Sequence, residues 1–294
     1  MTTPTATATI EPRKVPTRRI SFEESLRDLP RHFAADGDLI TSHVIAALSS
    51  VFPDGEDFFV RSVRRYRDRI TDPELKRQVS GFIGQEAMHG REHRAFNDRL
   101  AELGYPTKRI ERMTRRMLTS RERIMSDASN LALTAALEHF TATLAELVLT
   151  DADVRRRMGD PAVRDLFVWH ALEEAEHKAV AFDVYRAIGG TERMRIVTMK
   201  GIRIGFIVFI TLHVIASLLR DRETYRRGVL WRSWRNFASS SLMDVAIWRK
   251  LRMYDRPGFH PDDIDTDELV ERWREELFGK DGSLNELLVT AKGA

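Results

Sequence analysis

Two copies of one short motif, a glutamate followed three residues later by a histidine, place residue types that bind metal ions at helical spacing. Glu86 and His89 form the first copy, and Glu174 and His177 form the second. Residues three apart lie about 60° apart around an α-helix, so both side chains of a pair project from one face. Each pair can therefore offer a metal ion a carboxylate oxygen and an imidazole nitrogen.

Two single glutamates complete this pattern. Glu56 precedes the first pair, and Glu138 lies between the pairs in a segment of Leu, Ala and Thr. An ionised Glu138 among apolar residues would cost several kcal/mol unless it were paired or bound a cation. Bundles that hold two metal ions take one Glu from each of two helices and a Glu-x-x-His pair from each of the other two. The order of these residues therefore predicts a dinuclear metal site.

Further residues of ligand type lie within one helical turn of the pairs. His170 precedes Glu174 by four residues, and we expect it to bind metal as well, with a hydrogen bond to a ligand carboxylate as the alternative. His93 lies one turn after the first pair and is expected either to bind metal or to hydrogen-bond a ligand. Glu173 could replace Glu174 as the carboxylate ligand. The predicted metal ligands are Glu56, Glu86, His89, Glu138, His170, Glu174 and His177.

These ligands need long helices to hold them, and cap and break signals predict where the helices lie. The Asp-Pro pairs at 72–73 and 160–161 combine a capping side chain with a proline in the first helical turn. The Phe-Pro-Asp-Gly segment at 52–55 predicts a break between two helices. We expect helices over residues 38–50, 56–70, 72–103, 107–157, 161–188, 191–220, 223–253 and 266–277, with an interruption near 126–130.

The composition favours an all-α protein and restricts the metal chemistry. Hydrophobic residues make up 43% of the 294 residues, and helix formers dominate the middle of the chain. There is no cysteine, which excludes disulfides, thiolate zinc sites and iron–sulfur clusters. Any metal must be held by His and carboxylate, which suit iron, manganese or zinc. The net charge of +3 is nearly balanced, so we expect no nucleic-acid partner.

The composition also divides the chain into three parts. Residues 1–20 are rich in Thr, Pro and Arg and lack an apolar stretch, so we expect a flexible tail on a cytoplasmic protein. Residues 21–190 should form the metal-binding bundle, and residues 191–294 an extension packed on it. Within the extension, residues 205–219 are apolar but shorter than the roughly 20 residues that span a bilayer. They predict a buried central or dimer-interface helix, with a homodimer expected. The alternatives are a helix at a membrane surface and a true membrane span.

The order of ligands over residues 54–188 resembles the ferritin-like di-iron carboxylate superfamily. This resemblance implies an all-α protein, namely a ferritin-like four-helix bundle with additional C-terminal helices, and two metal ions, with iron expected. The placement of His170 is similar to the third-histidine site of arylamine N-oxygenases. The wider sequence is most similar to a bacterial family of predicted metal-dependent hydrolases. The segments that carry this second resemblance are residues 52–59, 85–89, 170–178, 182–185 and 257–261.

Three functions remain open. The ligand count favours a di-iron oxygenase or oxidase that uses dioxygen and an electron donor to oxidise a small or hydrophobic molecule. Alternatively, two divalent ions could activate a water for ester or amide hydrolysis, as the family description implies. A non-enzymatic iron-binding protein is the third possibility, although residues 191–294 are a large addition for an iron store. Trp231, Trp234 and Trp248 in that extension could line a pocket or a dimer interface.

Overall fold

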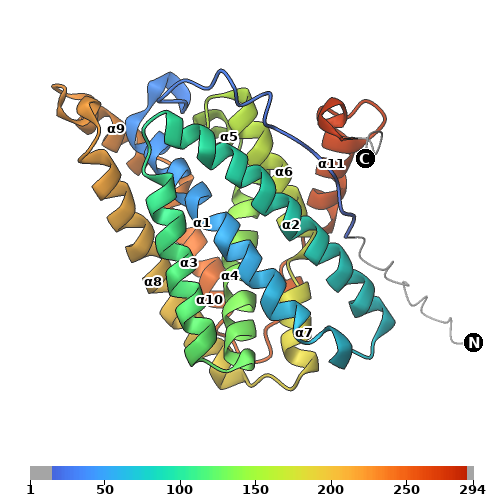
Figure 1. The fold of residues 1–294 in the computed structure, drawn as a ribbon. Coiled ribbons are helices and arrows are strands. Elements are labelled where there is room, and N and C mark those ends of the chain that lie inside the picture. The colour runs from blue at the N-terminus through green and yellow to red at the C-terminus, as the bar shows by residue number, and fades with distance from the viewer. Residues whose placement is uncertain (1–14, 290–294) are drawn as a thin grey trace, which may run out of the picture.

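The computed structural model describes residues 15–289, which form an all-α protein as predicted (Figure 1). Within this range there is no strand, and one isolated bridge joins Ile20 to Leu288. The helices are α1 (Leu39–Arg64), α2 (Pro73–Glu102), α3 (Thr107–Ile124), α4 (Asp127–Thr150), α5 (Ala152–Arg157), α6 (Pro161–His177), α7 (Val180–Ala187), α8 (Glu192–Leu218), α9 (Val229–Ala238), α10 (Val245–Met253) and α11 (Asp267–Phe278).

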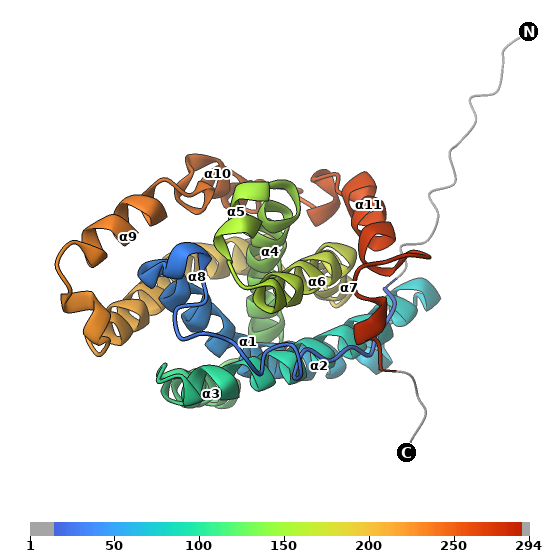
Figure 2. The same cartoon turned by 90° about the horizontal axis from the view of Figure 1, so that it is seen from above.

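Four of these helices, α1, α2, α4 and α6, carry the predicted ligands and lie together in the middle of the molecule (Figure 2). α1 packs along α2, and α4 packs along α6. Phe82 and Phe96 of α2 are fully buried, and burying one such side chain stabilises a fold by about 2–3 kcal/mol. Asp72 and Asp160 cap α2 and α6 as predicted, because each carboxylate accepts a backbone N–H of the first turn.

The predicted break at residues 52–55 is wrong, because α1 runs through Pro53 without interruption. Proline has no N–H, so it leaves the carbonyl of Ser49, four residues earlier, without its helical partner. Asn97 of α2 compensates for this loss, since its Nδ2 donates to the Ser49 carbonyl oxygen at 3.1 Å. Glu56 therefore lies inside a long helix rather than at the start of a short one.

Several other helices are shorter than predicted. The expected interruption before α4 is confirmed, because Ser126 caps the start of that helix. A second break, at Asp151, separates α4 from α5. The predicted helix over 161–188 ends at His177 and resumes as α7, and the one over 223–253 consists of α9 and α10. All the predicted ligands nevertheless fall on helices.

The N-terminal segment at residues 15–22 runs across α2 instead of extending into solvent. Gly81 and Gly84 of α2 permit this close approach, because a Cβ atom at either position would collide with the segment. For residues 15–20 the predicted flexible tail is therefore wrong, whereas residues 1–14 lie outside the described part of the chain.

The helices after residue 190 surround the other four. α8 packs on α1 and α4, α9 on α1, α10 on α4, and α11 on α6. By length and composition alone, α4 and α8 are each apolar enough to cross a membrane. Of the most apolar part of each helix, 67% is buried in α4 but only 22% in α8. The reading of residues 205–219 as a buried central helix is therefore wrong, and the two surface readings stand.

Candidate metal centre

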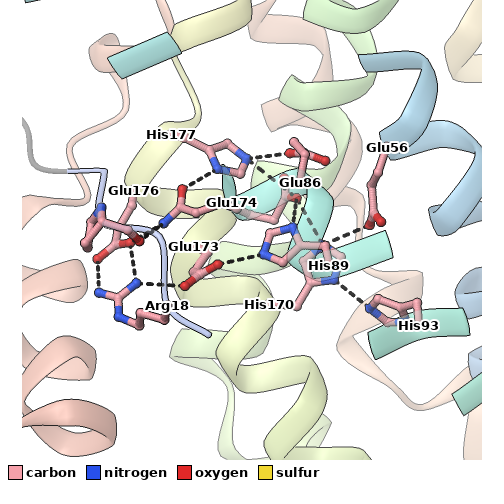
Figure 3. Close-up of polar contacts among 12 residues, drawn as sticks. Arg18, Glu56, Glu86, His89, His93, His170, Glu173, Glu174, Glu176 and His177 are labelled. Atoms are coloured by element: carbon pink, nitrogen blue, oxygen red, sulfur yellow. Dashed lines mark hydrogen bonds and ion pairs between the residues drawn. The ribbon is translucent and has the colours of Figure 1, made fainter. Parts of the chain in front are cut away.

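The predicted ligands meet in one buried cluster between α1, α2, α4 and α6 (Figure 3). Each of the four helices contributes at least one carboxylate, and α2 and α6 also contribute histidines. Each of the seven predicted ligands is buried, with at most 5% of its surface exposed. The residues brought together are Glu56, Glu86, His89, Glu138, His170, Glu174 and His177.

Within the cluster, two groups of three residues have the composition of a metal site. Glu56, Glu86 and His89 each offer a ligand atom, and these atoms lie within 4.8 Å of one another. Glu86, Glu138 and His177 form the second group by the same measure. His177 Nε2 lies 3.1 Å from Glu86 Oε1 and 3.3 Å from Glu138 Oε2. Because Glu86 belongs to both groups, it lies between them.

Glu174 also faces both groups. Its Oε1 lies 3.0 Å from His170 Nε2 and 3.7 Å from His89 Nδ1. The same oxygen lies 3.7 Å from Nε2 of His177. One carboxylate oxygen thus faces a nitrogen from each of three histidines. Ligand atoms of His170, His89 and Glu174 also lie within 4.8 Å of one another. His170, the expected additional ligand, therefore lies beside the first group.

Many ligand-type atoms in this cluster are completely buried and have no hydrogen-bond partner. They are both carboxylate oxygens of Glu56, Glu86 and Glu138, together with Nδ1 of His89 and Nε2 of His177. Folded proteins pair nearly all buried polar atoms, because each unpaired one costs about 1–3 kcal/mol. So many unpaired acceptors converging on one volume fit a site shaped to hold cations.

Burial and mutual repulsion disfavour the ionised form of three of these carboxyls. Burial, with the charges of Glu86 and Glu174, raises the pKa of Glu56 well above its usual range. Burial and the charge of Glu138 do the same to the pKa of Glu86. Burial and the charge of Glu174 raise the pKa of Glu138 to about 7. A bound cation would reverse these shifts, because a nearby positive charge favours the ionised form.

Glu174 and His177 behave in the opposite way. Burial opposes the charged form of both, but their mutual attraction, with Glu86 and Glu138 beside His177 and His170 beside Glu174, outweighs it. The pKa of Glu174 therefore lies well below its usual range, and that of His177 well above. In the metal-free protein, a proton on His177 thus supplies the positive charge that the carboxylates lack.

Residues outside the cluster fix which nitrogen of each histidine faces it. Nδ1 of His177 donates to Gln85 Oε1 at 2.8 Å, which directs Nε2 towards the glutamates. Nε2 of His89 donates to Glu173 Oε2 at 3.1 Å, which directs Nδ1 inwards. Burial and the neighbouring His170 lower the pKa of His89 well below its usual range, so its ring is neutral. A neutral imidazole oriented by a partner is the form that binds metal.

A sequence profile of one protein family, described as predicted metal-dependent hydrolases, matches residues 16–265. The chain belongs to this family. No curated protein matches the chain, and no solved structure matches it. The family description agrees with several His and Glu groups that are able to hold metal, and it specifies neither the metal nor the number of ions.

In this member of the predicted metal-dependent hydrolases, His93 supports a ligand through both of its ring nitrogens. Its Nδ1 lies 2.9 Å from Ser49 Oγ, and its Nε2 lies 2.7 Å from His170 Nδ1. His93 and His170 also lie close enough to Glu56 to share a three-ligand group. Because both nitrogens of His93 are engaged, the geometry favours its role as the partner that orients His170.

Glu173 lies at the edge of the cluster, between His89 and Arg18 of the N-terminal segment (Figure 3). Its carboxylate accepts from Arg18 Nη1 at 2.9 Å and from His89. Arg18 Nη2 also pairs with Glu176 Oε1 at 2.7 Å. The geometry therefore favours Glu174 over Glu173 as the ligand. Sequence reasoning missed Arg18, because nothing in a Thr- and Pro-rich tail indicates where an arginine docks. It also assigned no role to Gln85, although that residue adjoins Glu86.

An apolar cavity of about 370 Å³ lies against one side of the cluster, at Glu56, His170 and Glu174. Apart from these ligands, the polar side chains among residues 15–289 that line it are Thr114, Thr141 and Arg121. Its apolar lining comprises Val51, Phe52, Phe59, Met117, Leu118, Leu133, Leu137, Phe140, Leu144, Ile202, Phe206 and Phe209. The tryptophans of residues 191–294 do not line this cavity, whereas two phenylalanines of α8 do.

Proposed function

We propose that the cluster binds two metal ions and is the active centre of an oxidoreductase that uses dioxygen to oxidise an apolar molecule. Glu56 and His89 would hold one ion together with His170. Glu138 and His177 would hold the other. Glu86 and Glu174, which face both groups, would lie between the ions. In this proposal the arrangement is a ferritin-like di-iron site, with manganese or zinc as the metals that the same donors also accept.

The charge of the cluster supports two ions rather than one. The four glutamates assigned as ligands are buried, and within residues 15–289 no arginine or lysine side chain pairs with any of them. Two divalent cations would supply four positive charges to match. Arg18 balances Glu173 and Glu176 separately, outside the ligand set. Buried charge without such compensation would be strongly destabilising.

The apolar cavity beside the cluster is the observation that favours an oxidative reaction. Bound as a reduced pair, the iron ions would supply electrons to dioxygen. The chain itself contributes an enclosed apolar wall, which excludes water and holds an apolar molecule against His170 and Glu174. Thr141 Oγ1 donates to Glu174 Oε2 and fixes that carboxylate at the cavity wall. Few other donors line the cavity, whereas hydrolysis would benefit from donors aimed at a developing oxyanion.

Hydrolysis is the second candidate, because the family description favours it over oxidation. Two divalent ions can lower the pKa of a bound water and stabilise the charge that develops on a carbonyl oxygen. The same ligands would serve both reactions, and an ester or amide with apolar substituents would fit the same cavity. The two candidates therefore differ in whether dioxygen and a reductant are consumed.

The distinguishing experiment begins with metal-free protein that is loaded with ferrous iron without oxygen. We expect about two irons per chain, because two ligand groups share the cluster. Admission of air should then consume dioxygen and produce the absorption of an oxo-bridged ferric pair. Metal content, oxygen uptake and the visible spectrum are measured on the same sample, with chelated protein as the control.

Other outcomes would contradict the oxidative proposal. Turnover of apolar esters or amides with zinc or manganese, in the absence of oxygen and reductant, would establish the hydrolytic alternative. Tight binding of a single zinc ion, with no uptake of iron, would remove the dinuclear iron site itself.

A further inference from the structure

One face of α8 exposes a continuous row of large apolar side chains. Ile204, Val208, Leu212, Ile215 and Leu219 follow one another at intervals of three or four residues, which places them along one side of the helix. Their side chains are 48–69% exposed. The opposite side of α8 packs on α1 and α4. Contiguous exposed apolar surface of this kind marks an interaction site on a folded protein.

α9 extends this surface beside α8. Leu230, Trp231 and Trp234 are exposed, and they line an open groove of about 800 Å³ between the two helices. Val214 and Leu218 of α8 form part of the opposite wall. Both helices lie on the same side of the molecule, at the edge furthest from α11 (Figure 2). Tryptophan is enriched where proteins meet the boundary between water and lipid.

Basic residues surround the apolar surface. Residues 220–235, which include the turn between α8 and α9, contain six Arg against two acidic residues. α3 contains seven Lys and Arg against two Glu, and exposes Met113, Met117 and Ile124. The whole chain carries a net charge of only +3, so its positive charge is concentrated on this side. We call the exposed surface of α3, α8 and α9 the basic apolar face.

We propose that the basic apolar face docks on the surface of an anionic lipid bilayer. Apolar residues with tryptophan would enter the boundary region, while the arginines would contact the lipid phosphates. α8 would lie along the surface, because its inner side is held to the protein. Arg203 anchors it there, since its Nη2 lies 2.7 Å from Asp255 Oδ2.

A second copy of the chain fits this face less well. In a symmetric dimer the same patch meets itself, so arginines of one copy would lie against arginines of the other. An anionic bilayer instead offers charge opposite to that of the face. Charge complementarity therefore favours a membrane-surface helix over a dimer interface for residues 205–219.

The mouth of the metal-site cavity opens on the same face. Met117 and Arg121 of α3 and Ile202 and Gly205 of α8 line the cavity together, so it lies between these two helices. Gly205 is exposed and has no neighbouring atom within 4 Å of the position of a Cβ. If the proposed function holds, an apolar molecule could pass from the lipid to the metal site without crossing water. Docking itself does not depend on that function.

Vesicle binding by the full chain tests docking without any assay of activity. Metal-loaded and chelated protein are each sedimented with phosphatidylcholine vesicles and with vesicles that also contain phosphatidylglycerol. We expect binding to the anionic vesicles that weakens at high salt, and little binding to the neutral ones. If metal-loaded and chelated protein bind the vesicles equally, docking does not depend on the metal. The result then stands whether the proposed function succeeds or fails.

Two sets of variants locate the surface. The double variant Trp231→Ser/Trp234→Ser should bind about tenfold more weakly, and Arg226→Gln/Arg227→Gln about fivefold more weakly for each arginine removed. Arg272→Gln on α11 and Val245→Ser on α10, both exposed and outside the face, are the matched controls and should bind as the parent does. Circular dichroism checks that each variant keeps its helices.

Three results would overturn the proposal. The first is the absence of binding to anionic vesicles by the folded parent. The second is equal binding by the parent and both face variants. The third is a stable dimer in sedimentation velocity that dissociates in Ile204→Glu/Val208→Glu, because that dimer would occupy the face itself.

Discussion

Two clusters of histidine and carboxylate each include a residue of α1, and they differ in how their polar atoms are satisfied. The central cluster contains the predicted metal ligands. The second consists of His32, His43 and Asp221, whose ligand atoms also lie within 4.8 Å of one another. By residue type and spacing alone, both are candidate metal sites.

In the second cluster, every one of these side chains has protein partners. Asp221 Oδ2 accepts from His32 Nε2 at 2.9 Å and from His43 Nε2 at 3.2 Å. Arg31 Nη2 adds a permanent positive charge 3.1 Å from the same oxygen. Nδ1 of His43 lies 2.7 Å from Ser217 Oγ. This network connects the segment before α1, α1 itself and the end of α8, and it engages Nε2 of His32, both nitrogens of His43 and Oδ2 of Asp221.

The two clusters also differ in charge balance. Burial alone would raise the pKa of Asp221, but hydrogen bonds from His32, the Glu223 N–H and His43 hold it well below its usual range. Burial lowers the pKa of His43 to about 4, so that ring is neutral. In the central cluster the pKa values of Glu56, Glu86 and Glu138 are raised, because burial and neighbouring carboxylates outweigh the positive charge that His177 supplies. Both clusters contain ligand-type residues, so residue type does not distinguish them. Unpaired buried acceptors distinguish a metal site from a hydrogen-bonded network that only stabilises the fold.

The largest expected effect is on metal content, which should fall in a variant of the central cluster but not in a variant of the second cluster. Glu86→Ala removes the carboxylate shared by both ligand groups, so we expect its metal content to fall from about two ions per chain to less than one. Asp221→Asn is the matched control, and it should keep full metal content while losing stability. Elemental analysis after desalting measures both. Full metal content in Glu86→Ala, or metal loss in Asp221→Asn, would reverse the assignment of the two clusters.

The pH dependence of stability should sharpen the comparison in the metal-free protein. Burial raises the pKa of Glu138 to about 7, and it raises that of Glu173 to about 7 even though Arg18 opposes the shift. An exposed Glu titrates near 4.5. Between these values the folded state holds protons that the unfolded chain has lost, so the free energy of unfolding should decrease as pH rises. The decrease is on the order of 3 kcal/mol for each such carboxyl.

His177 acts in the same direction at higher pH. Its pKa is raised in the folded state, so its contribution is present below 6.5 and is lost as pH rises through the folded value. Urea unfolding at a series of pH values, with and without metal, measures the dependence. Bound metal should remove the contributions of Glu138 and His177, because it replaces their protons, and should leave that of Glu173, which is not a ligand. A metal-free protein whose stability rises steadily from pH 5 to pH 7 would contradict the uncompensated central cluster.

A smaller effect should follow from the residue that orients His177. Gln85→Ala removes the acceptor of the His177 Nδ1–H, and we expect metal affinity to fall about tenfold to a hundredfold. Gln78→Ala, on the same helix, removes an amide that contacts only Glu74 and is the control. Competition with a chromophoric chelator measures both affinities. Equal affinities would show that His177 is held by packing alone.

Much of this site could be predicted because helical periodicity is local. The spacing within Glu86–His89 and Glu174–His177 determines which side chains share a face, whatever the rest of the chain does. The continuity of α1 through Pro53 could not be predicted in this way, because it depends on an Asn97 side chain from another helix. The docking of Arg18 likewise depends on tertiary contacts. The reaction was the least accessible feature, and the family description favours the hydrolytic alternative over the oxidative one.

The bridge between Ile20 and Leu288 has a consequence for the order in which the molecule assembles. The Ser21 N–H donates to the Leu287 carbonyl oxygen at 3.1 Å, and the Val289 N–H donates to that of Arg19 at 2.8 Å. The bridge therefore joins two segments that are separated by most of the described residues, 15–289. Such a distant contact carries a high cost in loop-closure entropy. We expect the four ligand helices to associate before this bridge forms, so Arg18 should pair with Glu173 and Glu176 late in folding.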